Sequence, residues 1–296
     1  NGAFVFAKGQ NFAYAFSKID GTVESIEYNG KNVLLGEKFS LWRAPLDNDR
    51  FVKNTWSSTE QTCAVQYEGN LRYAVSSAQN IKANLTESGA EIECEFILGC
   101  KGRPPIISGT QTFSVYPDGV LKIKVSGFIR QNMKIWLPRV GLLWKINEHF
   151  DNLRYFGFGD YETYIDKHHG AVMGEYLKKV SENLCPDSKP QEWGNVFGAR
   201  FASLSDNSGS GITFAGDFSL NASNYSDGQI ADTRHREELK KEDGIFIHTD
   251  KFFSGAGSAS CGPELQKKYK TPEGEFEFEL LIAPAEKDGY GLLKRI

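Results

Sequence analysis

Asp47, Asn48 and Asp49 place three short polar side chains in a row, four positions after an arginine. Two carboxylates can act as acid and base, or acid and nucleophile, on a sugar bond if they stand about 5–10 Å apart. The same oxygens suit Ca²⁺ or Na⁺, but the rest of an EF-hand loop is missing, and we predict no metal site here. Pro45 stiffens the preceding backbone, so a loop held at the edge of a pocket is one interpretation. A surface turn capped by its own side chains is the simpler one.

A second group of carboxylates, Asp160, Glu162 and Asp166, lies in the segment 156–167. Glycosidase chemistry would again require two of them at a defined separation, which a sequence does not give. Because Asp and Glu are mostly exposed in folded proteins, turn and surface carboxylates are the alternative interpretation.

The chain has five histidines, of which His235 stands out because arginines flank it in Thr233-Arg234-His235-Arg236. It could donate a hydrogen bond to a ligand, and a surface or structurally bonded histidine is the alternative. No His-x-x-x-His pair and no cluster of His and Cys is present, so no transition-metal site is predicted.

Several function classes have no support in the sequence. Gly-x-Gly-x-x-Gly, Walker and Gly-x-Ser-x-Gly motifs are missing, which speaks against nucleotide binding and serine hydrolase chemistry. The net charge is -4, and the adjacent lysines Lys178-Lys179, Lys240-Lys241 and Lys267-Lys268 are isolated pairs, so nucleic acid is not an expected partner. No apolar run approaches the roughly 18 residues of a membrane span. Five cysteines without a Cys-x-x-Cys signal neither a disulfide framework nor zinc. The chain starts without Met, which suggests processing or a cut from a longer chain and leaves its location open between cytoplasm and periplasm.

The elements that must position these residues are predicted to be strands. Short runs with a period of two alternate with turn residues, and Asn29-Gly30 and Pro117-Asp118-Gly119 predict two hairpins. We expect strands at 12–16, 23–28, 33–35, 73–75, 81–85, 91–96, 110–116, 120–125, 139–146, 246–249 and 276–282. This pattern predicts an all-β fold, a large antiparallel sandwich, over 1–296 as a single domain. A split near residues 125–135 is the alternative, but no linker composition supports independent domains.

Helical signals are few in this chain. Ser226 is expected to cap a short helical turn through Gln229, Ile230 and Ala231. The charged run 234–241 could be helical although it has almost no apolar face. Residues 50–60 show no period and are expected to form a loop or a short irregular helix.

Taken together, these stretches resemble the C-terminal domain of family 2 β-galactosidases. Residues 43–49 resemble its Arg-Ala-Pro-x-Asp-Asn-Asp motif. Residues 157–167 resemble its Gly-x-Gly-Pro-x-Glu-Asn-Tyr-x-Asp-Arg motif, in which Glu162, Tyr164 and Asp166 match and positions 160, 163 and 167 differ. Three further segments follow in family order: Pro190 to Asn195, Asn224 to Ser226 with Thr233 to His235, and Gly255 to Pro263.

The resemblance implies an antiparallel β-supersandwich like that of galactose mutarotases, within a longer polypeptide. In the family, the two catalytic Glu residues and the Mg²⁺ ligands belong to a preceding (β/α)₈ barrel. It therefore implies no catalytic residue and no cofactor in this segment, which alone should be inactive on galactosides. The implied partners are the preceding domains and a galactoside sugar, in a parent enzyme that is a homo-oligomer.

Two loops would adjoin the sugar in such an enzyme. The first comprises Arg43, Asp47, Asn48, Asp49, Arg50 and Phe51, and the second contains Ser260 and Cys261. Family members usually carry Gly where this chain has Phe51, and the late loop often supplies a Trp platform where this chain has Cys261. In the family the loop after Asp-Asn-Asp closes over bound sugar, and here it corresponds to the region from Arg50 to Trp56. A stiffer lid in this region and weaker sugar stacking are the expected consequences. Glu162, Glu192 and His235 are further polar candidates for the pocket.

Two alternative functions come from the same fold. One is a stand-alone mutarotase-like epimerase, in which His235 and Glu192 would serve as the acid and base. The other is a carbohydrate-binding module without chemistry. The first rests on analogy of fold alone.

Overall fold

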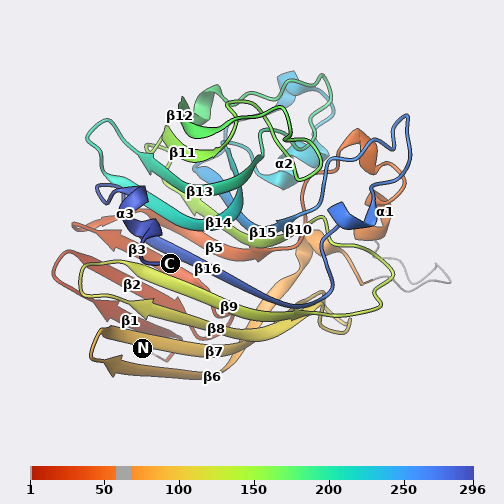
Figure 1. The fold of residues 1–296 in the computed structure, drawn as a ribbon. Coiled ribbons are helices and arrows are strands. Elements are labelled where there is room, and N and C mark those ends of the chain that lie inside the picture. Colours follow the sequence, from red (N-terminus) through yellow and green to blue (C-terminus); the bar gives the residue numbers. More distant parts are fainter. Residues whose placement is uncertain (1, 58–67) are drawn as a thin grey trace.

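The computed structural model describes residues 2–57 and 68–296. Antiparallel strands form nearly all the regular structure in these ranges, as Figure 1 shows. The strands are β1 Phe4–Lys8, β2 Phe12–Ser17, β3 Val23–Tyr28, β4 Lys31–Asn32, β5 Leu34–Ser40, β6 Val75–Thr86, β7 Gly89–Gly99, β8 Ile107–Val115, β9 Leu121–Ile129, β10 Arg139–Ile146, β11 Asn152–Phe158, β12 Met173–Lys179, β13 Val196–Ser205, β14 Gly211–Ser223, β15 Ile245–Phe253 and β16 Gly274–Pro284.

Two sheets carry the fold. The small one has the order β1-β2-β3-β4. The large one runs β12-β11-β13-β14-β16-β9-β8-β7-β6, with β15, β10 and β5 branching from β14. The fork arises because residues 212–216 of β14 pair with β16, whereas residues 219–223 pair with β15. Strand β14 thus joins the two parts of the large sheet.

The predicted antiparallel all-β class is confirmed by this architecture. In β7 the carboxylates of Glu91, Glu93 and Glu95 alternate with the buried side chains of Ile92, Cys94 and Phe96. This is the pattern of a strand with one face on the core. Both hairpins form where the turn residues predict them, and Asn29, Gly30 and Gly119 adopt positive φ angles of 50°, 75° and 80°.

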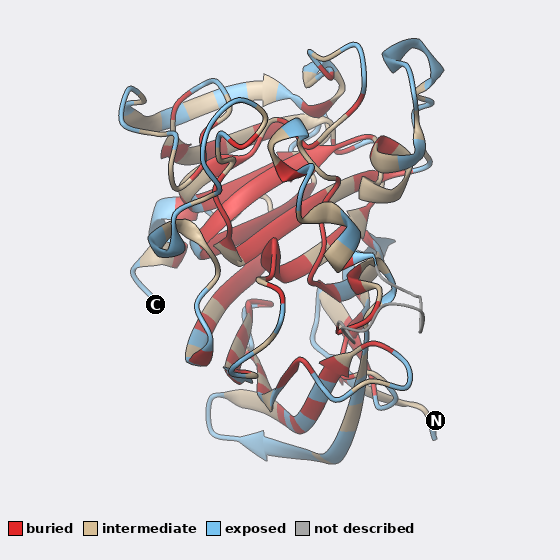
Figure 2. Cartoon of the chain, turned by 90° about the vertical axis from the view of Figure 1, so that its right-hand side faces the viewer, coloured by how far each residue is buried: buried red, intermediate tan, exposed pale blue. Residues whose placement is uncertain are grey.

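Strands β1, β11, β12, β13 and β14 were not among the predicted elements, and the strand predicted for 73–75 falls on the end of the 3₁₀ turn Leu71–Tyr73 and the first residue of β6. Twelve of the thirteen residues of β14 are buried, and Asp217 is the exposed one. With both faces covered, the strand lacks the alternation of polar and apolar residues by which a half-buried strand is recognised. Figure 2 shows these buried central strands in red, surrounded by exposed loops.

The described helices are short: α1 Lys53–Trp56, α2 Asp227–Asp232 and α3 Gly289–Leu293. The predicted cap is confirmed, because the Ser226 side chain accepts a hydrogen bond from the Gln229 amide. The helix suggested for 234–241 is wrong, and only a 3₁₀ turn, Arg236–Glu238, forms there. That run has no apolar face to pack against the core. The irregular helix expected within 50–60 corresponds to α1, and positions 58–60 lie outside the described residues. No helix in the described ranges has the length and hydropathy that crossing a membrane requires.

Candidate functional site

Arg43 and Asp49 form a buried ion pair beneath the first predicted loop. The guanidinium Nη1 lies 2.5 Å from Asp49 Oδ2, and Nη2 lies 3.2 Å from Oδ1. Asp49 also accepts a 2.7 Å hydrogen bond from the Leu46 amide, and the rings of Trp56 and Phe253 flank the guanidinium. Asp49 does cap its own turn, but inside the protein. The interpretation as a plain surface turn is therefore wrong for Asp49 and fits only exposed Asp47.

Asn48 links this first loop to the second one, more than 200 positions later. Its Nδ2 donates hydrogen bonds to the carbonyls of Ala256 and Gly257, at 3.1 and 2.8 Å. Its Oδ1 accepts from the amide and the hydroxyl of Ser260, at 3.0 and 2.5 Å. One amide side chain thus fixes the position of residues 256–260 relative to the 3₁₀ turn Asp47–Asp49.

Asp166, from the second predicted motif, holds the same late loop from the other side. Its two carboxylate oxygens accept hydrogen bonds from the amides of Ala256 and Gly257, at 2.8 and 2.7 Å. A side chain at Gly255 would meet the Asp166 carboxylate, because a Cβ there would lie only 2.5 Å from its Cγ. Three segments far apart in sequence therefore meet at the end of the molecule where α1 lies (Figure 1).

The outer surface of this loop cluster carries the other residues predicted for the two loops. Asp47, Arg50, Phe51 and Cys261 are exposed, and Ser260 is half-buried. The Phe51 ring is 66% exposed, and the Arg50 guanidinium lies 4.4 Å from its centroid. Buried ion pairs and hydrogen bonds thus support a rim whose side chains face away from the core.

Glu162 lies next to this framework. Its Oε1 lies 2.7 Å from the Lys167 Nζ, and its Oε2 accepts longer hydrogen bonds from Tyr164 and the Gly194 amide. Burial raises the pKa of Tyr164 well above its usual value, and the nearby Glu192 and Glu162 carboxylates add to this effect. Tyr164 therefore acts as a neutral hydrogen-bond donor.

A buried charge cluster around Arg139 was not anticipated as a site. The Arg139 side chain is fully buried, with its nitrogens 3.1 Å from Asp250, 3.1 Å from Asp227 and 3.9 Å from Glu192. His248 Nε2 lies 2.8 Å from the Arg139 Nη1 and 3.2 Å from Asp227. In the sequence Arg139 is only the first residue of a predicted strand. Glu192 was predicted as a pocket residue from the family resemblance, but no local signal marks Asp227, His248 or Asp250.

The carboxylates of this cluster differ in protonation. Burial raises the pKa of Glu192 to about 8, although Arg139 opposes the shift. Burial also raises the pKa of Asp250. Asp227 behaves in the opposite way, because His248 and Arg139 outweigh its burial and lower its pKa to about 2. A single guanidinium among three carboxylates thus favours a neutral Glu192, whose Oε1 accepts from Asn221 at 2.7 Å.

The pair required by the epimerase alternative is not brought together. Glu192 is buried inside the charge cluster, whereas His235 is exposed beside the turn Arg236–Glu238. The His235 amide donates to Glu238, and no interaction joins His235 to Glu192 among the described residues. Within residues 2–57 and 68–296, no group of three His, Cys, Asp or Glu side chains is arranged to hold a metal ion.

Solved structures with this fold include galactose mutarotase-like proteins. A galactose mutarotase-like protein from Lactobacillus casei superposes with a TM-score of 0.55 at 10% identity, covering 95% of this chain and 99% of that one. A galactose 1-epimerase from Lactobacillus acidophilus superposes with a TM-score of 0.51 at 10% identity, covering 95% of this chain and 94% of that one. The chain therefore has the galactose mutarotase-like all-β fold, as predicted.

Sequence similarity then gives the family. The β-galactosidase small-chain family model matches residues 8–282, and the chain belongs to this family. A β-galactosidase from Actinobacillus pleuropneumoniae is 30% identical over 274 residues, covering 92% of this chain and 26% of the relative. One from Staphylococcus xylosus is 30% identical over 275 residues, covering 91% of this chain and 26% of the relative. The chain thus spans about a quarter of the length of these relatives.

Proposed function

We propose that residues 1–296 form a single C-terminal domain of a longer β-galactosidase and that its two linked loops form part of the wall of the galactoside site. The observation that carries the proposal is the Asn48 side chain, which joins the first loop to the second by four hydrogen bonds. Such a tie makes the exposed rim one rigid unit. A rigid rim holds a substrate at a lower entropic cost than two independent loops.

The parent enzyme supplies the chemistry in this proposal. Its barrel carries the two carboxylates of a retaining glycosidase and binds Mg²⁺, while this chain contributes the rim and contacts the preceding domains. The parent is a homo-oligomer in the same proposal. Membership in the β-galactosidase small-chain family supports this division, as does the coverage of only about a quarter of each relative.

A chromogenic galactoside assay tests directly whether catalysis belongs to the parent enzyme's barrel and not to this chain. The 296-residue chain alone is expected to release no chromophore, and the chain joined to its upstream portion is expected to be active. Hydrolysis by the isolated chain would contradict the proposal. So would an adjacent coding sequence that encodes no barrel with two Glu residues at strand ends.

Two substitutions in the joined protein test the rim itself. Asn48→Ala should raise KM because the two loops separate, while Asn11→Ala, in the exposed turn between β1 and β2, should leave KM unchanged. Cys261→Trp should lower KM by roughly 2- to 10-fold, because it supplies the aromatic face that the family often has there. Cys261→Ser is the matched control. Unchanged KM in both Asn48→Ala and Cys261→Trp would exclude the rim from the sugar site.

A further inference from the structure

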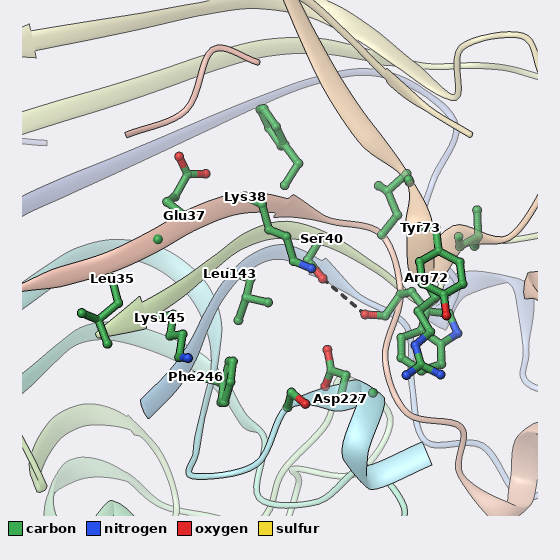
Figure 3. A pocket seen from close by; sticks show the side chains of 18 residues that line it. Leu35, Glu37, Lys38, Ser40, Arg72, Tyr73, Leu143, Lys145, Asp227 and Phe246 are labelled. Atoms are coloured by element: carbon green, nitrogen blue, oxygen red, sulfur yellow. Dashed lines mark hydrogen bonds between the residues drawn. The ribbon is translucent and has the colours of Figure 1, made fainter. Parts of the chain in front are cut away.

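A cavity of about 430 Å³ lies on the face of the large sheet formed by β5, β10 and β15 (Figure 3). Residues 226–228 at the start of α2 and residues 71–74 form its remaining walls. Its volume falls within the range of small-molecule sites, about 300–1,000 Å³. None of the rim residues Asp47 to Phe51, Ser260 and Cys261 lines it.

The pairing of β10 with β5 and β15 determines which side chains form the floor of this cavity. Lys145 of β10 stands opposite Gly36 of β5 and opposite Phe246 of β15. Leu143 stands opposite Lys38 in the same way. The two lysines are therefore diagonal neighbours on one face, about 7–8 Å apart at their backbones. Gly36 leaves open space between them, because a Cβ there would meet no atom within 4 Å.

Neither lysine of the cavity has a carboxylate within ion-pair distance in the described part of the chain, although Lys38 helps to lower the pKa of Asp227 and the Lys145 Nζ lies 5.5 Å from the centroid of the Phe246 ring. The Asp227 carboxylate already lies 3.1 Å from Arg139 and 3.2 Å from His248. Arg72 is engaged by Asp232 through two hydrogen bonds of 2.8 and 2.7 Å. Lys38 and Lys145 form no ion pair with any carboxylate among the described residues.

Glu37 does not neutralise its neighbour Lys38. Its side chain lies on the other side of β5 from Leu143, Lys145 and Phe246 (Figure 3) and accepts a 2.7 Å hydrogen bond from the Val23 amide. The cavity therefore offers two ammonium groups to a ligand. A negatively charged group is the complement of that pair.

The rest of the lining suits a ring with hydroxyl groups. Phe246, Leu143 and Tyr73 provide apolar surface, and the Trp42 indole N–H is buried without an acceptor among the described residues. Sugar sites combine aromatic faces with directed donors in this way, since a sugar ring has apolar C–H faces and polar edges.

We propose that this cavity binds a monosaccharide that carries a carboxylate or a phosphate. The anionic group lies between Lys38 and Lys145, and the ring packs against Phe246 and Leu143. This site is additional to the galactoside rim and does not depend on it. A uronic acid and a sugar phosphate present the same shared chemistry, a ring with one anionic substituent.

Calorimetric titration of the 296-residue chain tests the proposal. The probes are galacturonate, galactose 6-phosphate, neutral galactose and inorganic phosphate, each at low and at high salt. At least one charged sugar is expected to bind, more tightly than either galactose or phosphate, and more weakly at high salt. Comparison of the two charged sugars identifies which anion is preferred. The proposal would be overturned if neither charged sugar binds. It would also be overturned if neutral galactose or inorganic phosphate binds as tightly as the charged sugars.

Three variants locate the site. Lys38→Gln combined with Lys145→Gln should weaken binding at least about tenfold, because hydrogen bonds to charged groups are among the stronger ones. Gly36→Ile should block the cavity while both lysines remain. Lys18→Gln combined with Lys101→Gln removes two exposed charges elsewhere and should not change binding. Thermal unfolding of each variant verifies its fold, and unchanged binding in folded Gly36→Ile protein would place the ligand elsewhere.

Discussion

Arg43 and Arg139 are both fully buried, yet their charges are compensated differently. Asp49 meets Arg43 with two oxygens, so that pair is neutral by itself. The Arg139 guanidinium lies within 3.9 Å of three carboxylates and a histidine. A buried ion is costly whenever a partner is removed, so the two sites should respond differently to single substitutions.

Asp49→Asn should destabilise the chain by about 3–5 kcal/mol, because it leaves the Arg43 guanidinium buried without a compensating charge. Urea denaturation measures the free energy of unfolding. Asp47→Asn is the matched control, since that exposed side chain two positions away makes no ion pair with any residue in the described part of the chain. A loss equal to that of the control would mean that the Arg43–Asp49 pair contributes little to stability.

The Glu37 carboxyl group should make stability depend on pH. Burial raises its pKa from the usual 4.5 to about 8, so the folded chain retains a proton that the unfolded chain releases. The free energy of unfolding contributed by Glu37 is therefore fully present below pH 4.5 and is lost as the pH rises to about 8. The slope approaches about 1.4 kcal/mol per pH unit for one such proton.

Glu37→Gln is expected to reduce this slope between pH 5 and pH 8 without abolishing it, because the pKa of Glu192 is also raised to about 8. Denaturation curves at several pH values measure the effect. Exposed Glu24, on β3, provides the control variant Glu24→Gln, which should keep the wild-type slope. An identical slope in Glu37→Gln protein would show that Glu37 is already ionised in the folded chain.

Among the elements, β10 illustrates how close contacts inside the sheet restrict the sequence. A Cβ at Gly141 would lie 2.3 Å from the Asp250 Oδ1 and 2.6 Å from the Thr249 carbonyl, on the neighbouring strand β15. The bulge between Val140 and Gly141 brings β15 this near. Asp250 then reaches Arg139, at 3.1 Å. The glycine thus makes room for the charge cluster.

Gly141→Ala should cost about 3 kcal/mol or more in unfolding free energy, because β15 must move away and strain the buried Asp250. Gly36→Ala, on the adjacent strand β5, is the matched control. It meets open space and should stabilise the chain by up to about 1 kcal/mol. Similar free energies for the two variants, measured by urea denaturation, would refute the close contact at Gly141.

At the scale of the whole molecule, the reactivity of four of the five cysteines can show whether the loops and the strands unfold together. Cys94, Cys100 and Cys185 are buried, whereas Cys261 is exposed on the late loop. Burial raises the pKa of Cys94 to about 11, which further slows its reaction. Cys94 belongs to β7 and Cys185 to a loop after β12, so the two thiols sample separate parts of the fold.

A thiol reagent should therefore label native protein in two phases. In a Cys63→Ser background, which removes the cysteine outside the described residues, one thiol should react fast and three at the rate of unfolding. Cys261→Ser should abolish the fast phase. If Cys185 reacts well before Cys94, the loops over the sheet open independently of the strands.

The amino-acid sequence alone predicted several of the half-buried strands, the hairpins and the α2 cap, because these depend on residues within a few positions of each other. The order of short motifs also predicted the β-galactosidase family. Strands β1, β11, β12, β13 and β14 were not predicted. In β13 and β14 the burial of most residues removes the local alternation.

Only the tertiary structure decided which motif residues meet. Asn48 and Gly257 are 209 positions apart, and Arg139 and His248 are 109 apart. Neither contact has a local signature, because the residues approach only when the forked sheet brings its loops to one end. The sequence thus determined strands, turns and family membership. Tertiary packing determined the rigid rim, the buried charge cluster and the lysine-lined cavity, because each needs partners from distant segments.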